Sequence, residues 1–375
     1  MINIFQPSLD KLELHEIQKV FDSNWLGRGK QVFEFEYLFS KNLKMSQDFF
    51  YALSCCTEGL FLASKLFNFG PGDEVIVPSI SFIAAGSAVI DSGAKLVICD
   101  VDQRSLNATA ETIKDKITSK TKAVILNHYG GHPCDMDPIL KIAKENNIFV
   151  IEDSACAVES FYKGKACGTI GDMGIWSFDA MKSIVTGDGG MIYLKSQELL
   201  NQVKEECYLG LPAKSTSGID KSSDNCDMWW EVQINRPGRR AIMNNISAAI
   251  GIAQMKKLRG FQAKRKEIYN KYNEAFRKNS NIEIPPKLVD GASNSYYFYW
   301  IQTDKRNQLA NHLKENDIYS TYRYWPLNDV DYFNVNDKSL VNTKYASNHT
   351  LNLPLHPSLT NKDIDKIIST VNSFF

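Results

Sequence analysis

The sequence lacks several features that define whole classes of protein. None of its eight cysteines belongs to a CxxC pair, so a zinc site has no support. No run of about 18 apolar residues is present, so we expect no membrane-spanning helix. Lys plus Arg and Asp plus Glu both number 43, which leaves no overall basic charge to attract nucleic acid.

The sequence also lacks the marks of a secreted protein. Residues 1–21 are amphipathic and acidic, with neither a basic region nor an apolar core, so we expect no secretory signal. The cysteines are then expected to be free thiols in a reducing compartment. We therefore predict a cytoplasmic protein.

Short apolar runs that end in polar residues alternate with helical patterns in the first half of the chain. The runs read as buried strands, and amphipathic stretches such as 136–145 lie between them. This alternation predicts an α/β fold with a mostly parallel sheet sandwiched by helices. The predicted strands are residues 74–78, 95–100, 123–127, 148–152, 174–178 and 190–194.

The pattern changes near residue 252. Since single cores stop growing near ~250–300 residues, a chain of 375 residues has room for a second, smaller one. We predict a large domain over 1–252, including an N-terminal arm, and a smaller α+β domain over 253–375. In the smaller domain we expect a charged helical stretch at 253–278, an aromatic strand at 295–302 and helices at 307–316 and 361–374.

One stretch between these two parts is rich in Ser, Lys and Asp. Because such residues favour turns and solvent, residues 213–225 are predicted to form a surface loop.

Lys182 is the first candidate for chemistry. It lies between a predicted strand and a glycine cluster, in the sequence SFDAMKSIVTGDGG. Most lysines are solvated surface charges, but glycines let the backbone approach a ligand closely. A partly desolvated lysine in such a loop can have a lowered pKa, as an amine that forms a Schiff base needs.

Asp153 is the second candidate, because it closes the predicted strand FVIED. Ligands of α/β sheets gather at the carboxyl ends of strands. A carboxylate there can cap a helix, or it can pair with the protonated pyridine nitrogen of a cofactor. That pairing keeps the ring cationic and able to accept electrons from a carbanion.

Two further segments have the composition of a cofactor site. The turn SCCTEG at 54–59 precedes a helix, and small residues at a helix start expose N–H groups that favour an anion such as phosphate. Ser177 can add a hydroxyl to the same anion. Phe82 follows a strand end, where its ring is either an ordinary core aromatic or a surface that stacks on a cofactor.

The sequence resembles a known family at five segments in order. They are LSCCTEGL, VPSISF, IEDSACAVES, YKGKACGTIGDMG and the loop that contains Lys182. Together they are similar to the sugar aminotransferases of the DegT–StrS group, from residue 24 to the C-terminal LNLPLHPSLT. The resemblance implies the fold type I of pyridoxal-phosphate (PLP) enzymes, with a mostly parallel sheet of about seven strands and a smaller C-terminal domain.

The resemblance also implies roles for eight residues. Lys182 would form the Schiff base with PLP and move the proton, and Asp153 would hold the pyridine nitrogen. Phe82 would stack on the ring. The remaining positions would contact the cofactor: Cys56, Thr57 and Ser177 at the phosphate, Cys156 near the cofactor, and Arg240 at the phosphate of the partner in a homodimer.

The chain departs from the family pattern at three places. Cys56 stands where relatives have Gly before Thr, and Cys156 stands where they have Gln or His. Residues 323–328 read RYWPLN, where relatives show HY-x-P-x-H, so both histidines are missing. Because relatives approach the substrate with this last segment, we expect an atypical substrate.

The function implied by the resemblance is a ping-pong transamination by PLP. Glutamate would donate the amino group to a nucleotide-linked keto sugar, for polysaccharide or glycoconjugate biosynthesis. A small phosphorylated ketone is an alternative substrate, because Arg239, Arg240 and Arg323 suit phosphate groups.

Two other classes of function remain open from the sequence. In related PLP-dependent sugar dehydratases histidine replaces the lysine, so Lys182 argues against that activity. A regulatory or scaffold protein of this fold usually carries a DNA-binding module, and no helix-turn-helix pattern or basic patch is present here.

Overall fold

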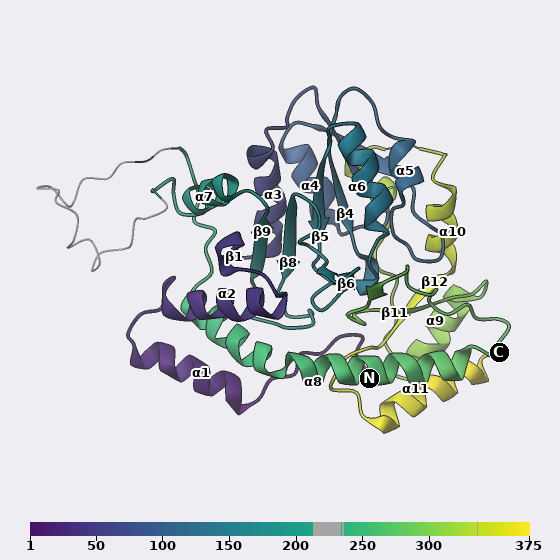
Figure 1. The fold of residues 1–375 in the computed structure, drawn as a ribbon. Helices are drawn as coiled ribbons and strands as arrows, with labels where there is room; N and C mark the ends of the chain where they lie inside the picture. Colours follow the sequence, from purple (N-terminus) through teal and green to yellow (C-terminus); the bar gives the residue numbers. More distant parts are fainter. Residues whose placement is uncertain (213–233, 235, 336) are drawn as a thin grey trace, which may run out of the picture.

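A seven-stranded sheet forms the centre of the chain in a computed structural model, which describes residues 1–212, 234, 236–335 and 337–375 (Figure 1). The predicted loop at 213–225 lies outside the described residues. The strand order is β1-β9-β8-β5-β4-β2-β3. The strands are β1 (Phe50–Leu53), β2 (Glu74–Pro78), β3 (Lys95–Cys99), β4 (Thr121–Asn127), β5 (Phe149–Asp153), β8 (Met173–Ser177) and β9 (Gly190–Leu194).

The pairing in this sheet is mostly parallel, as predicted. Strands β3, β2, β4, β5 and β8 run parallel, and β9 is antiparallel to both β8 and β1. The six strands predicted for this sheet are present within two residues at each end, whereas the aromatic strand predicted at 295–302 covers only Tyr299–Gln302. β1 was not predicted, although its four residues, FYAL, are buried throughout like those of the predicted strands β2, β8 and β9.

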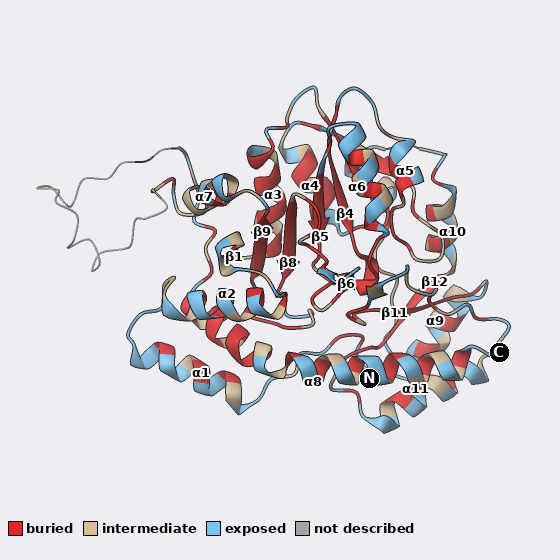
Figure 2. Cartoon of the chain, viewed as in Figure 1, coloured by how far each residue is buried: buried red, intermediate tan, exposed pale blue. Residues whose placement is uncertain are grey.

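Helices cover both faces of the sheet, since alternate residues along each strand face opposite sides and both sides are apolar. In β2, Val75 and Val77 pack with one group of helices while Ile76 packs with the other. Figure 2 shows the strands as buried on both faces. One layer is α3 (Cys56–Leu66), α4 (Ile83–Asp91) and α7 (Gln197–Glu206); the other is α2 (Lys30–Asn42), α5 (Ala110–Lys114), α6 (Met136–Glu145) and the first part of α8 (Asn245–Phe276).

The C-terminal part packs on the second half of α8. Its core joins the antiparallel pair β11 (Tyr299–Gln302) and β12 (Thr350–Leu353) to α9 (Arg306–Glu315) and α11 (Asn361–Ser373). The other elements are α1 (Lys11–Asp22), which packs on α8, α10 (Val341–His349), and a small sheet of β6 (Phe161–Tyr162), β7 (Lys165–Ala166) and β10 (Ala292–Ser293).

The observed bounds of α8 correct the predicted start of this helix and bear on the predicted domain boundary. The helix begins at Asn245 rather than at residue 253, because the Asn244 side chain accepts a hydrogen bond from the Ser247 amide and caps it there. The predicted domain boundary at 252/253 falls inside this continuous helix, and the division into two domains stays a prediction. In the part of the chain that the structure describes, no helix is both long and apolar enough to cross a bilayer.

Glu152 ties the end of β5 to the turn at residues 168–171. Its side chain is fully buried and accepts hydrogen bonds from the amides of Gly168 (2.8 Å), Ile170 (2.8 Å) and Gly171 (2.6 Å). It also lies 3.0 Å from Nε2 of His128. Because Nδ1 of His128 accepts from the Cys134 amide, Nε2 carries the proton and donates to Glu152.

We expect the substitution Glu152→Ala to lower the free energy of unfolding by about 3–5 kcal/mol, because it leaves three buried amides and an imidazole N–H without an acceptor. Urea unfolding measures the loss. Glu274→Ala, at an exposed position of α8, is the matched control and should change stability by less than about 0.5 kcal/mol. A loss below about 1 kcal/mol for Glu152→Ala would contradict this role.

Candidate active site

A cavity of about 270 Å³ opens at the carboxyl edge of the parallel strands. Asn127 ends β4, Asp153 ends β5 and Ser177 ends β8, and all three line it. This is the edge at which α/β sheets bind ligands, because helix starts and loops gather there.

Seven of the eight predicted site residues line this cavity. They come from four separate segments of the chain: Cys56, Thr57, Phe82, Asp153, Cys156, Ser177 and Lys182. Arg240 is not among the lining residues; it is exposed, and its guanidinium lies 5.5 Å from the centre of the Tyr208 ring. Its predicted reach into a partner subunit stays a prediction.

The N-terminus of α3 forms one wall of the cavity. The first amides of a helix have no partner within the helix, and the N-cap residue Cys55 makes no side-chain capping bond. Gly190 of β9 passes closely behind, so that a Cβ there would lie 2.6 Å from the amide nitrogen of Cys56. The wall therefore presents amides and the positive end of a helix dipole, which suit an anion such as phosphate.

Lys182 lies among acidic and aromatic side chains. Its Nζ is 3.8 Å from Sγ of Cys156 and 5.2 Å from the centre of the Tyr297 ring. Burial lowers the pKa of Lys182, but the ionisable groups of Cys156, Tyr297, Asp153 and Cys56 outweigh it and raise the pKa above the usual lysine range. The prediction of a lowered pKa is therefore wrong, because the sequence did not show these neighbours.

Asp153 is a buried carboxyl, with 6% of its surface exposed. Its Oδ1 accepts a hydrogen bond from the Ala155 amide at 3.0 Å. Burial raises its pKa, while the Ala155 amide and the positive charge of Lys182 act in the opposite direction. A cationic ligand group beside this carboxyl would favour its charged form.

The cavity residues that the sequence analysis missed include Asn127, Tyr297 and Tyr324. Asn127 ends β4 as Asp153 ends β5, so the same strand-end signal could have found it; its buried Oδ1 has no hydrogen-bond partner within the described residues. Tyr297 donates to the Met181 carbonyl at 3.3 Å. The hydroxyl of Tyr324 lies 3.5 Å from Sγ of Cys156, and its ring meets the Phe82 ring edge-on at 5.7 Å.

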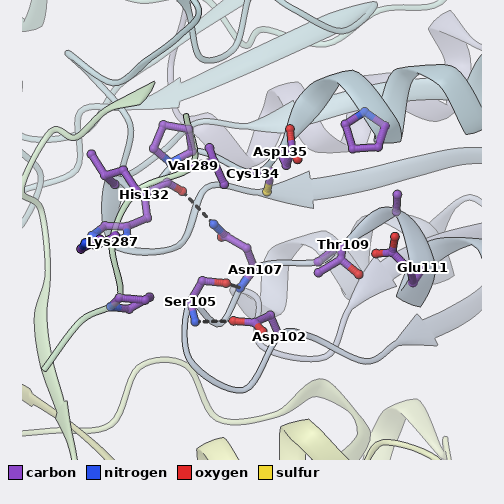
Figure 3. A pocket seen from close by; sticks show the side chains of 16 residues that line it. Asp102, Ser105, Asn107, Thr109, Glu111, His132, Cys134, Asp135, Lys287 and Val289 are labelled. Carbon is purple, nitrogen blue, oxygen red and sulfur yellow. Dashed lines mark hydrogen bonds between the residues drawn. The ribbon is translucent and has the colours of Figure 1, made fainter. Parts of the chain in front are cut away.

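A second cavity, of about 310 Å³, is a weaker candidate (Figure 3). Asp102 accepts hydrogen bonds from the amides of Arg104 and Ser105, and Asn107 donates to the His132 carbonyl, so these polar groups hold the local backbone. Burial lowers the pKa of His132 to about 3, so this imidazole stays neutral at physiological pH. The cavity at Lys182 is therefore the candidate active site.

Comparison with known proteins assigns the chain to a family. A family model described as the DegT/DnrJ/EryC1/StrS aminotransferase family matches residues 7–372. The chain belongs to this family. It is therefore an aminotransferase with the fold of type I PLP enzymes, as the resemblance implied.

Several relatives and solved structures cover almost the full chain. A dTDP-4-dehydro-2,3,6-trideoxy-D-glucose 4-aminotransferase of Saccharopolyspora spinosa is 43% identical, with 97% of this chain and 94% of the relative aligned. The crystal structure of the aminotransferase TlmJ from Streptoalloteichus hindustanus is 41% identical, with a TM-score of 0.93, and covers 100% of this chain and 98% of its own. The putative sugar aminotransferase Spr1654 from Streptococcus pneumoniae, solved in its PMP form, is 25% identical, with a TM-score of 0.91, over 100% and 98%.

The cofactor of this family is PLP, and the cavity fits it chemically. A lysine amine, a buried carboxyl, a helix N-terminus and an aromatic ring line one space. The unpartnered Oδ1 of Asn127 adds a polar atom that a ligand can satisfy.

Proposed function

We propose that this enzyme converts a keto sugar, carried on a nucleotide, into an amino sugar for polysaccharide or glycoconjugate biosynthesis. The observation that carries the proposal is that Lys182 and Asp153, from different segments, line one cavity beside the start of α3. The relative from S. spinosa, named for a dTDP-linked keto sugar, supports the substrate class.

The residues that line the cavity have separate roles in the proposed reaction. PLP supplies an electron sink when it is bound. Lys182 would hold the cofactor covalently and, once released, would be the base that moves the proton from the donor's α-carbon. Asp153 holds the pyridine nitrogen protonated by charge pairing.

The other residues position the cofactor. Amides at Cys56 and Thr57, with the Ser177 hydroxyl, bind the phosphate, and Phe82 covers the ring. Cys156 borders the cofactor on the side of Lys182. The proposal also includes glutamate as amino donor, a homodimer in which Arg240 reaches the partner's phosphate, and a cytoplasmic location. The seven described cysteines are free thiols, which agrees with a reducing compartment.

A small phosphorylated ketone remains the second candidate substrate, because Arg323 lines the cavity and suits phosphate. We do not propose a sugar dehydratase, since Lys182 lines the cavity where the related dehydratases have histidine. We also do not propose a regulatory or scaffold protein.

We expect the enzyme loaded with pyridoxamine phosphate to regain visible absorbance fastest with a nucleoside-diphosphate keto sugar. Contacts to the nucleotide can lower the barrier of the chemical step. The rate over KM with the nucleotide sugar should therefore exceed the rate over KM with a small keto phosphate by at least about 100-fold. Stopped-flow absorbance measures the rate over KM for both substrates. The matched control is the same nucleotide sugar with a hydroxyl in place of the ketone, which should give no signal; a response to small keto phosphates alone would overturn the proposed substrate.

A further inference from the structure

Arg323 is a cation that lines the active-site cavity and contacts Phe5 and Met181. Its guanidinium carbon lies 5.1 Å from the centre of the Phe5 ring, and its Nη2 lies 3.9 Å from Sδ of Met181. In the described part of the chain, no ion pair includes Arg323. A guanidinium that faces a cavity in this way is available to an anionic ligand.

Arg323 belongs to the end of the cavity where Lys182 reacts. Met181, its contact, is the residue before Lys182. Phe5, its other contact, stacks on Tyr297 at 5.5 Å with an interplanar angle of 9°, and the Tyr297 ring faces Nζ of Lys182. Tyr324, its neighbour in the chain, meets Cys156 at 3.5 Å, and Cys156 lies 3.8 Å from Nζ of Lys182. Arg323 and Lys182 therefore line the same cavity and are connected through a few intervening side chains.

The location of Arg323 suits one of the two anionic groups that the substrates carry, the α-carboxylate of the amino donor or the diphosphate of the nucleotide sugar. An α-amino acid carries its carboxylate on the carbon that loses the proton, one bond from the reacting centre. The diphosphate of a nucleotide sugar is several bonds away from the ketone. A cation that lines the same cavity as the proton-transferring amine, and that contacts the residue before it, suits the first. Its planar fork can bind a carboxylate with two parallel hydrogen bonds.

We propose that Arg323 binds the α-carboxylate of the amino donor and so selects α-amino acids over other amines. This inference rests on the proposed function for both substrates, the keto sugar and glutamate as the amino donor. A phosphate of the keto substrate also suits a guanidinium. The two half-reactions separate these two ligands, because the carboxylate enters only in the first and the phosphate only in the second.

The test compares wild-type and Arg323→Gln holoenzymes in each half-reaction by stopped-flow absorbance. In the first, the probes are L-glutamate and L-isoglutamine, which has an amide in place of the α-carboxylate. We expect the variant to lose about 100-fold in rate over KM with L-glutamate. We also expect the wild type to discriminate against L-isoglutamine by a similar factor, and the variant to lose that discrimination.

In the second half-reaction, the probe for the pyridoxamine-loaded enzyme is a dTDP-linked 4-keto-6-deoxy sugar. We expect the variant to stay within about threefold of the wild type. A loss confined to this arm would assign Arg323 to the sugar phosphate and overturn the proposal. If the sugar does not react with either enzyme, the proposed substrate fails while the glutamate arm still tests Arg323.

Two more variants separate binding from structural support. Arg323→Lys keeps the charge and should recover part of the glutamate rate, whereas Arg277→Gln removes an exposed arginine at the end of α8 and should match the wild type. Equal losses in both half-reactions would mean that Arg323 only supports the Lys182 loop. That result, or a wild type that does not discriminate against the α-amide, overturns the proposal.

Discussion

The Lys182→Ala enzyme will lose the visible absorbance of covalently held PLP and its transaminase activity together. Lys182 is the lysine that lines the cavity, so within the described residues no second amine there can replace it. The variant loses both the covalent attachment and the base that moves the proton. General acid–base catalysis alone contributes about 10²–10⁴-fold, so the turnover should fall by at least about 10³-fold.

Two control variants make this result specific. Lys182→Arg keeps a cation beside Cys156 and Asp153 but cannot form the covalent bond, so it should be as inactive as the alanine variant. Lys278→Ala, at an exposed position, should keep both the absorbance and the rate. Turnover that persists in Lys182→Ala would refute the assignment of the amine, and with it the role of the cavity.

The sequence predicted the parts of this site that lie at strand ends. A parallel sheet brings the carboxyl ends of its strands to one edge, so Asp153 at the end of β5 and Ser177 at the end of β8 meet there by topology alone. Lys182 follows β8 by a short loop and must lie nearby. Local pattern and chain connectivity therefore sufficed for these residues.

Another part of the cavity lining could not be predicted in the same way. Tyr297 and Tyr324 come from the C-terminal part, more than a hundred residues further along the chain, and reach the cavity through the packing of the segments around β11 on the large sheet. No periodicity or capping signal specifies such a long-range contact. The missing histidines at 323–328 marked the segment as unusual, but only the structure places Arg323 beside Met181.

The same limit explains the wrong expectation for the pKa of Lys182. Desolvation could be anticipated from the glycine-rich loop, and it does lower the pKa. The opposing effect comes from Cys156 and Tyr297, whose distance from the amine depends on three separate segments of the chain. The pKa of Lys182 therefore depends on side chains that only the folded chain brings together, whereas the local sequence pattern indicates only that the lysine is buried.

Asp153→Asn will bind PLP and keep its visible absorbance, but both half-reactions will slow by about 10²–10³-fold. The amide has nearly the shape of the carboxylate, and its oxygen can still accept the Ala155 amide, so the cavity should keep its form. What it loses is the negative charge that holds the pyridine nitrogen protonated. Removing one member of a buried charge pair costs about 3–5 kcal/mol, and the lower part of that range, about 3–4 kcal/mol, corresponds to rate losses of this size.

Single-turnover absorbance with L-glutamate measures the first half-reaction, and return of the band from the pyridoxamine form measures the second. Asp365→Asn, on the exposed side of α11, should leave both unchanged. Because the ring nitrogen serves as electron sink in both directions, the two rates should fall by similar factors, unlike the one-sided loss expected for Arg323→Gln. Wild-type rates in Asp153→Asn would show that the carboxyl does not act on the ring nitrogen, since an amide of the same shape cannot hold the proton there.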